Sequence, residues 1–250
     1  MASAAFISDI HANVEALDAV LMDIERQGIR DIYCLGDVVG YGPDPVACID
    51  RVMARCRSTI RGNHDDALVR GSVGFNPVAR AAIEWTRKRM LPRFFSPASR
   101  RRWKFITELP LQAEWEGFLL VHGSPRDPIL EYIMERDIIF GPPDVFSQIF
   151  ARFERVCLVG HTHIPGIFFE DPRFVPQREV PESFRYEGRK MLINVGSVGQ
   201  PRDHDPRACY LTVEEGLFRF HRLEYDYLAT QKKLRAIHQP RLAERLGEGV

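Results

Sequence analysis

Residues 4–37 read AAFISDIHANVEALDAVLMDIERQGIRDIYCLGD, and this stretch decides the fold class. Two short apolar runs, 4–8 and 32–35, have the composition of β-strands. Between them apolar residues recur every three or four positions, as on one face of a helix, and Gly28 stands where a helix typically ends. Strand, helix and strand in this order form a βαβ unit, so we predict an α/β fold with parallel strands.

The alternation continues beyond the second strand and then changes. Asp44 followed by proline predicts a helix that reaches about residue 55, and a third strand is expected at 58–61. From 65 to 108 only helical patterns occur. The later elements that we expect are helices at 145–153 and 227–238, strands at 119–121 and 156–159, and a more antiparallel group of strands at 191–195, 210–213 and 218–223.

We predict that these elements form a single domain over residues 1–250. Residues 66–116 are expected to be a helical insertion that caps the functional cleft. The preceding helix is expected to end before Pro240, and the residues from Arg241 onward are rich in charge, so we expect a frayed tail at 240–250.

Composition excludes several classes of protein. The chain has 250 residues, 34 Lys plus Arg and 34 Asp plus Glu, and lacks the basic excess expected of a protein that binds nucleic acid through phosphates. No apolar run is long enough to span a membrane, and residues 2–10 have no basic segment of the kind that begins a signal peptide, so we expect a cytoplasmic protein. Five cysteines without a CxxC pair fit buried free thiols better than a zinc site.

Polar side chains follow the predicted strands at the points where they end. Because the carboxyl ends of strands in an open α/β sheet meet at one crevice, we expect these side chains to be neighbours. Residues two apart in extended backbone point to the same side, which would pair the members of each Asp-x-His and His-x-His motif. The residues are Asp9 and His11 after the first strand, Asp37 after the second, Asn63 after the third, His122 after 119–121, and His161 and His163 after 156–159.

Seven oxygen and nitrogen ligands are too many for one tetrahedral zinc ion and suit two ions. Two nearby cations need a bridging anion, for which Asp37 is the natural candidate. Such a centre stays positive, attracts a phosphoester and lowers the pKa of a bridging water, so we expect hydrolysis by a metal-bridging hydroxide. His64 is placed to protonate the leaving alkoxide as a general acid, with Asp65 keeping its ring oriented and charged.

Residues 6 to about 200 resemble the calcineurin-like metallophosphoesterases, because five motifs occur in the same order and strand context. The motifs are Asp9-Ile10-His11, Gly36-Asp37, Gly62-Asn63-His64-Asp65, His122-Gly123 and Gly160-His161-Thr162-His163. The resemblance implies a four-layer α/β/β/α sandwich and two divalent metal ions chosen from Mn, Fe, Zn, Ni and Co. It also implies one ion on Asp9, His11, Asp37 and His163, and the other on Asp37, Asn63, His122 and His161.

The segment after Asp37 departs from the Ser/Thr protein phosphatases and the symmetrical dinucleoside tetraphosphatases, because the arginine of their motif is missing. The chain is therefore more similar to the small bacterial and archaeal phosphoesterases than to these two groups. Arg202 is expected to replace that arginine, although it could equally pair with Asp203 or Asp205. We also predict that Tyr41 contacts the substrate, although it could instead pack against its own turn. Asn194 and Ser197 are the remaining predicted substrate contacts, although their Gly-rich segment could be only a tight connection between a strand and a loop.

The function predicted from these features is hydrolysis of phosphate mono- or diesters, with small nucleotide-like compounds preferred. The insertion and the loop 40–45 would select the substrate. A protein phosphatase or a dinucleoside polyphosphate hydrolase is the enzymatic alternative, and a non-catalytic interaction scaffold is the alternative from another class. The basic run at 100–104 is interpreted as a solvated helix face rather than a nucleic-acid site, no membrane partner is expected, and the oligomeric state is left open.

Overall fold

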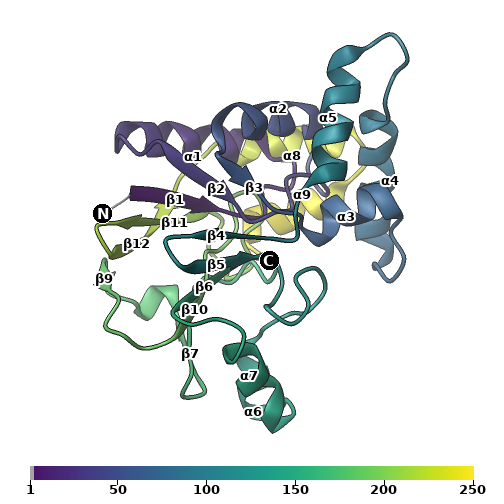
Figure 1. Cartoon of the computed structure of the whole chain (residues 1–250). Helices are drawn as coiled ribbons and strands as arrows, with labels where there is room; N and C mark the ends of the chain where they lie inside the picture. Colours follow the sequence, from purple (N-terminus) through teal and green to yellow (C-terminus); the bar gives the residue numbers. More distant parts are fainter. Residues whose placement is uncertain (1–2) are drawn as a thin grey trace.

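The computed structural model describes residues 3–250, so residues 1 and 2 of the predicted domain lie outside the described part. Two six-stranded sheets pack face to face, and helices cover the outer side of each sheet (Figure 1). The predicted four-layer α/β/β/α sandwich is confirmed.

The first sheet has the strand order β3-β2-β1-β11-β12-β9. Its parallel part contains the three strands expected from the opening βαβ pattern, and β11 then joins β1 in the antiparallel direction. The strands are β1 (Ser3–Ile7), β2 (Asp31–Cys34), β3 (Ser58–Thr59), β9 (Phe184–Arg185), β11 (Ala208–Glu214) and β12 (Leu217–Leu223).

The second sheet has the order β4-β5-β6-β10-β7-β8. Its three central strands are parallel to one another, and the outer strands run antiparallel to their neighbours. The strands are β4 (Gln112–Trp115), β5 (Phe118–Val121), β6 (Val156–Val159), β7 (Gly166–Phe169), β8 (Arg173–Pro176) and β10 (Met191–Asn194). Sequence patterns missed β4, β7, β8 and β9, which are short and lie between turns.

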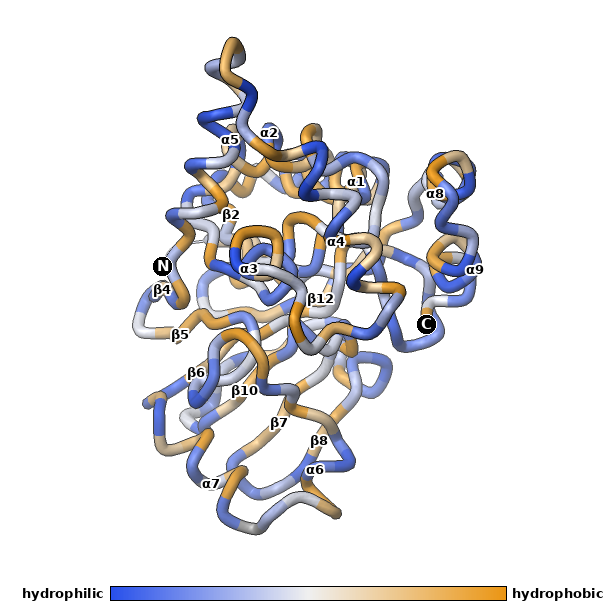
Figure 2. Tube along the Cα trace, turned by 90° about the vertical axis from the view of Figure 1, so that its right-hand side faces the viewer, coloured by the Kyte–Doolittle hydropathy of each residue, from blue (hydrophilic) through white to orange (hydrophobic). Residues whose placement is uncertain are grey.

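Three apolar clusters separate the four layers. Between the sheets, Phe6 of β1 packs with Trp115 and Leu158 of the opposite sheet. Helices α1 (Val14–Arg26) and α2 (Pro45–Arg55) bury their apolar faces against the first sheet, and α7 (Pro143–Phe150) buries Phe150 against the second. In Figure 2 hydrophobic segments recur along strands such as β5 and β7, and the outer turns contain both hydrophilic and hydrophobic residues. Four of the five predicted free thiols are buried and Cys56 is partly buried, as expected for core residues.

The C-terminal residues correct one prediction. Instead of a frayed tail, residues 240–250 contain the helix α9 (Pro240–Glu248), which follows α8 (Tyr227–Ala236). Leu242, Ala243 and Leu246 of α9 are buried in a cluster with Leu234 of α8 and Tyr41. The tail is ordered because these three side chains lie on one face of the helix and are covered on folding.

The predicted insertion 66–116 is helical only in part. It holds most of α3 (Asn63–Arg70), then α4 (Pro77–Met90) and α5 (Pro97–Glu108), but residues 112–115 form the edge strand β4. Helices α4 and α5 form a hairpin whose connecting loop protrudes from the body of the molecule (Figure 1, Figure 2).

The α4–α5 hairpin, residues 77–108, has a charge and apolar pattern unlike that of the whole chain. It contains nine Lys and Arg against two Asp and Glu, although the complete chain is neutral. Phe94 and Phe95 at its tip are 82% and 92% exposed. In the run 100–104, Arg100, Arg101 and Lys104 are exposed, as expected of a solvated face, and Trp103 packs against the core. Arg102 differs from this expectation, because it pairs with Asp50 of α2.

The remaining short helices are α6 (Glu135–Phe140) and the 3-10 turn η1 (Gln177–Glu179). Within residues 3–250, no helix combines the length and the apolar composition that crossing a bilayer requires.

Candidate metal centre and substrate cleft

The first group of predicted ligands converges at the ends of β1, β2 and β6. His11 Nε2 lies 3.1 Å from His163 Nε2, and His163 Nε2 lies 3.1 Å from Asp9 Oδ1. Asp37 Oδ2 is 3.6 Å from His11 Nε2. All four side chains are at most 2% exposed, so the group is sealed within the protein.

The second group forms around Asn63 at the start of α3. Asn63 Oδ1 lies 3.1 Å from His122 Nε2 and 3.0 Å from His161 Nδ1. Asp37 Oδ2 is also 3.5 Å from His122 Nε2, which places this one carboxylate between both groups. The structure therefore brings all seven predicted ligands together, with Asp37 in the position expected of a bridge.

Backbone carbonyls hold the outward-facing nitrogen of each histidine in the two groups. When these nitrogens donate a hydrogen bond, the opposite nitrogen of the neutral ring presents a lone pair to the centre. Several acceptors then face one another at about 3 Å, an arrangement that a bound cation stabilises. The contacts are His11 Nδ1 with Val39 O (3.2 Å), His122 Nδ1 with Leu35 O (2.8 Å), His163 Nδ1 with Gln200 O (2.5 Å) and His161 Nε2 with Leu130 O (3.3 Å).

Asp9 provides a further sign of a cation site. Its Oδ2 accepts a hydrogen bond from the His161 backbone N–H at 3.0 Å. Its Oδ1 is buried and receives no hydrogen bond among residues 3–250 when His163 donates through Nδ1 to Gln200 O, because His163 Nε2, 3.1 Å from Oδ1, is then itself an acceptor. A buried carboxylate oxygen without a partner is costly, so the residues present fit a metal ion as the missing partner.

The electrostatics of the centre also favour positive charge. Burial, together with the nearby His122, lowers the pKa of His161 to about 3. Burial alone would lower the pKa of His122, but the facing carboxylate of Asp37 outweighs it and raises that pKa to about 9. Burial likewise opposes ionisation of Asp9, yet His163 holds the pKa of Asp9 well below its usual range. The site attracts a positive charge, which a proton on His122 or a metal cation supplies.

The backbone at the ligands differs from the one we expected. Asp9 and His11 have φ of 54° and 47°, and His161 and His163 have φ of 67° and 62°. These values lie in the left-handed region, so the argument from extended backbone was wrong. Asp9 and His11 nevertheless face the same ligand group, and His163 and His161 face the first and the second group. Asp37, at φ 51°, shares the left-handed conformation. Non-glycine residues adopt it rarely, and such residues cluster at functional sites.

Two glycines allow the loops to approach the ligands closely. A Cβ atom on Gly160 would collide with the side chains of Ser8 and Asp9. A Cβ atom on Gly40, where φ is +89°, would collide with the ring of His64. Glycine is therefore required at both positions, because neighbouring side chains leave no room for a Cβ atom. At Gly40 the backbone conformation requires glycine as well.

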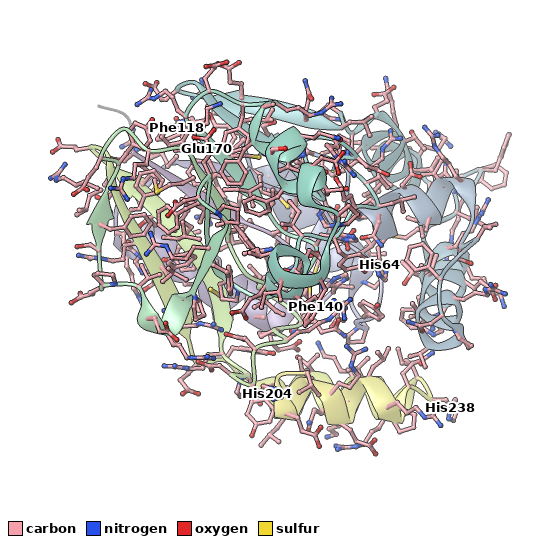
Figure 3. The ribbon with its side chains drawn as sticks, turned by 90° about the horizontal axis from the view of Figure 1, so that it is seen from below. His64, Phe118, Phe140, Glu170, His204 and His238 are labelled. Carbon is pink, nitrogen blue, oxygen red and sulfur yellow. The ribbon has the colours of Figure 1, made fainter. Side chains whose placement is uncertain are left out.

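His64 lies beside the first ligand group. One of its ring nitrogens is within 4.8 Å of ligand atoms of His11 and Asp37. The ring packs between Tyr41, with ring centres 4.4 Å apart, and Phe75, at 5.1 Å. His64 Nδ1 is buried without a hydrogen-bond partner in residues 3–250, and burial lowers the pKa of the ring to about 4. Figure 3 shows His64 in the interior of the molecule, next to the helices of the insertion.

The role predicted for Asp65 is corrected. Its carboxylate accepts hydrogen bonds from the backbone N–H groups of Gly62, Val38 and Val39, at 3.1, 3.4 and 3.3 Å, and none of its hydrogen bonds goes to His64. Burial, with Asp37 nearby, raises the pKa of Asp65 to about 7. Asp65 therefore joins the loop after β2 to the start of α3 rather than orienting the imidazole.

Two of the predicted substrate contacts are buried structural residues. Asn194 donates to Gly160 O (2.5 Å) and Thr162 Oγ1 (2.8 Å), and is 1% exposed. Ser197 is fully buried and donates to Asp9 O at 2.8 Å. Both shape the loops that carry ligands, and neither is accessible to a substrate.

Tyr41 and Arg202 lie together at the edge of the centre. Tyr41 is 8% exposed and packs against the rings of His11 and His64, so its interpretation as a packing residue fits better than that of a platform. Arg202 donates to Gln200 Oε1 at 2.9 Å, and its Nε is buried without a partner in residues 3–250. It pairs with neither aspartate considered earlier, because Asp203 binds Arg222 and Asp205 binds Arg207.

Sequence analysis missed the segment 130–136, which borders the centre. The ring of Tyr132 lies 3.8 Å from that of His161, and Tyr132 is 49% exposed. A pocket of about 420 Å³ is lined by Tyr132, Met134, Arg136, Thr162, Ile164, Arg202, His204 and Val250. The only signal was an aromatic residue in a loop after the His122-Gly123 motif, which is too common to single out.

Comparison with known proteins agrees with this geometry. Residues 3–216 match the calcineurin-like phosphoesterase superfamily domain, and the chain belongs to this family. It is a metallophosphoesterase by fold and site, with clusters of His and Asp able to hold metal.

Individual relatives span nearly the whole chain. An uncharacterized protein of Methanocaldococcus jannaschii is 37% identical over 98% of this chain and 95% of its own length. A metallophosphoesterase from Sphaerobacter thermophilus is 36% identical, with a TM-score of 0.83 over 100% of this chain and 99% of that one. A hypothetical protein of Pyrococcus horikoshii OT3, at 21% identity and a TM-score of 0.75 over 100% of this chain and 99% of that one, shares the fold.

Proposed function

We propose that the chain hydrolyses small phosphate mono- or diesters with two divalent metal ions bound. The observation that carries this proposal is the convergence of two acceptor groups on the shared carboxylate of Asp37. Asp9, His11 and His163 would hold one ion with Asp37, and Asn63, His122 and His161 the other. When bound, such ions polarise the phosphoryl group and lower the pKa of a coordinated water.

The protein's own side chains would then do three things. His64 is buried beside the first ligand group and would donate a proton to the leaving oxygen. Arg202 offers an unpaired Nε–H close to His163 and would bind a phosphate oxygen. Asp65 would hold the Asn63-His64 turn against the loop after β2, which positions His64 without touching its ring.

The pocket beside Tyr132 supports a small organic substrate, for which nucleotide-like compounds are one class. Tyr132 exposes about half of its surface next to His161, and Arg136 and Arg202 line the same pocket. We place the activity in the cytoplasm, because the five thiols are free, as in a reducing compartment.

Hydrolysis of bis-p-nitrophenyl phosphate and p-nitrophenyl phosphate by protein freed of metal and reloaded with Mn, Ni, Zn or Mg tests the proposal. We expect metal-dependent release of p-nitrophenol that Asp37→Asn abolishes, while Asp18→Asn, on the outer face of α1, keeps it. A folded protein that binds no metal would instead support the non-catalytic scaffold.

A further inference from the structure

The pocket beside the metal centre continues into a second, apolar pocket. This second pocket has a volume of about 230 Å³. It shares Met134, Arg136, Thr162 and Ile164 with the 420 Å³ pocket at Tyr132. The first pocket borders the metal centre, because Tyr132 in its lining packs against the ring of His161 and the Arg202 backbone N–H donates to His163 O. The second pocket adjoins the first on the side away from the centre, through their four shared residues.

The walls of the second pocket are mainly apolar. Phe168 and Phe174 pack ring to ring at 4.5 Å on one side, and Ile133 and Ile164 contribute to the lining. The hydroxyl of Thr162 already accepts hydrogen bonds from Asn194 Nδ2 and the Ile164 N–H. The other polar residues of the lining are Glu135 and Arg136, and the remaining five are apolar. A substrate group rich in hydroxyls would therefore find fewer partners here than in water, whereas an apolar group would be removed from water.

The metal centre and the second pocket differ in polarity. The centre and Arg202 suit a phosphate, and the second pocket suits a substituent without polar groups. We infer that the substrate is an amphiphilic phosphoester whose apolar substituent, alkyl or aryl, lies between Ile164, Phe168 and Phe174 while its phosphate lies at Asp37. This inference rests on the proposed function and names the class of substrate for the same site.

A series of p-nitrophenyl phosphodiesters tests it, because the leaving group and the chemistry stay constant while the second substituent changes. The substituents are methyl, hexyl, phenyl, a glycol ether of hexyl length and the 5′-thymidine group. Each buried methylene contributes a severalfold preference, so we expect kcat/KM for the hexyl and phenyl esters to exceed that for the methyl ester by about tenfold or more. The glycol ether should resemble the methyl ester.

Variants locate the effect in the second pocket. Phe174→Ser and, as an independent change at the shared wall, Met134→Glu should both bring the hexyl-to-methyl ratio close to one. Val175→Ser is the matched control, because Val175 follows Phe174 on β8 and lines a different pocket. It should keep the ratio of the unchanged protein.

Calorimetric titration of the metal-loaded protein with hexylphosphonate and methylphosphonate separates this inference from the proposed function. Tighter binding of hexylphosphonate by about tenfold, without hydrolysis of any ester, would support the pocket and contradict the function. Hydrolysis with a hexyl-to-methyl ratio near one, and equal affinities for the two phosphonates, would overturn the pocket and leave the function standing. A higher kcat/KM for the thymidine ester than for the hexyl and phenyl esters would overturn the inference of an apolar substituent and indicate a nucleoside instead.

Discussion

At the scale of single residues, left-handed backbone is concentrated in the ligand set. Asp9, Asp37 and His161 all adopt it, as do two of the remaining histidine ligands. Each such conformation costs of order 1 kcal/mol or more for a residue with a side chain. The surrounding contacts, such as the hydrogen bond from Ser197 to Asp9 O, must hold these residues in place. The surrounding fold, and not only the seven coordinating residues, thus determines the geometry of the site.

Replacing His64 by Ala should affect esters according to their leaving group. We expect kcat/KM for an alkyl phosphate ester to fall by about 10²–10⁴, because alkoxide departure needs a proton, and the value for a p-nitrophenyl ester to fall much less. Steady-state kinetics on both esters measures this, with metal content checked in parallel. Equal losses on the two esters would exclude His64 as the proton donor.

The identity of the ligands could be predicted from the sequence, but several supporting roles could not. Asp9 and His161 were identified because they follow apolar strands, and the topology then brings strand ends together. Asn194 and Asp65 were assigned wrongly, because their partners are backbone groups of distant loops. Sequence gives the type of a side chain at such a place, whereas its contacts depend on how the loops pack.

At the scale of elements, α9 shows why a charged segment can be ordered. Its sequence contains only a few apolar residues among Arg and Glu, which suggested fraying. The three buried side chains fall on one face and meet Leu234 and Tyr41. Figure 3 shows α9 extending from near His238 to near His204, whose backbone N–H donates to Gly249 O. The α/β class was predictable from the apolar runs of the central strands, whereas the four-layer sandwich was implied by the resemblance of the motifs to a known family.

Leu242→Ala in α9 should lower the free energy of unfolding by about 2–4 kcal/mol, because this side chain is 1% exposed and its loss leaves a cavity. Urea denaturation measures the change. Leu228→Ala in the neighbouring α8 is the control, since Leu228 is 61% exposed and should change stability little. Similar losses for both variants would contradict the packing described for α9.

The strand β12 carries a pH-dependent contact. Burial lowers the pKa of His221 from 6.5 to about 4, and Nε2 of its neutral ring lies 2.8 Å from Thr212 Oγ1. The unfolded chain takes up a proton at higher pH than the folded chain, so the free energy of unfolding should decrease as the pH falls from about 6.5 toward 4.

His221→Gln should remove part of this decrease, which unfolding curves at pH 7 and pH 5 would reveal. His238→Gln, at an exposed position on the loop between α8 and α9, is the control and should follow the unchanged protein. If both variants keep the full decrease, His221 does not contribute to it.

At the scale of the whole molecule, the centre joins parts of the chain that are far apart in sequence. Its ligands come from loops after β1, β2, β5 and β6 and from the start of α3, so both sheets meet at it. A cation held there connects the two halves of the sandwich. Stability should therefore depend on metal.

Chelation should lower the melting temperature, and added metal should restore it. A cation present at about 1,000 times its dissociation constant stabilises the folded state by roughly 4 kcal/mol. Differential scanning calorimetry with and without chelator measures this, and Asp9→Asn should lose the difference. A melting temperature that does not respond to metal in the unchanged protein would contradict a bound ion at these ligands.

The α4–α5 hairpin gives the molecule a large electric dipole. Because the hairpin is strongly basic and the chain as a whole is neutral, the rest of the chain carries a matching acidic excess, of which Asp9, Asp37 and Asp65 are buried. Near its isoelectric point of about 7.1 such a protein has no net charge but does not behave as an uncharged particle. At low salt it should be retained by cation and anion exchangers alike, oriented oppositely on each, with its aromatic tip facing the cation exchanger.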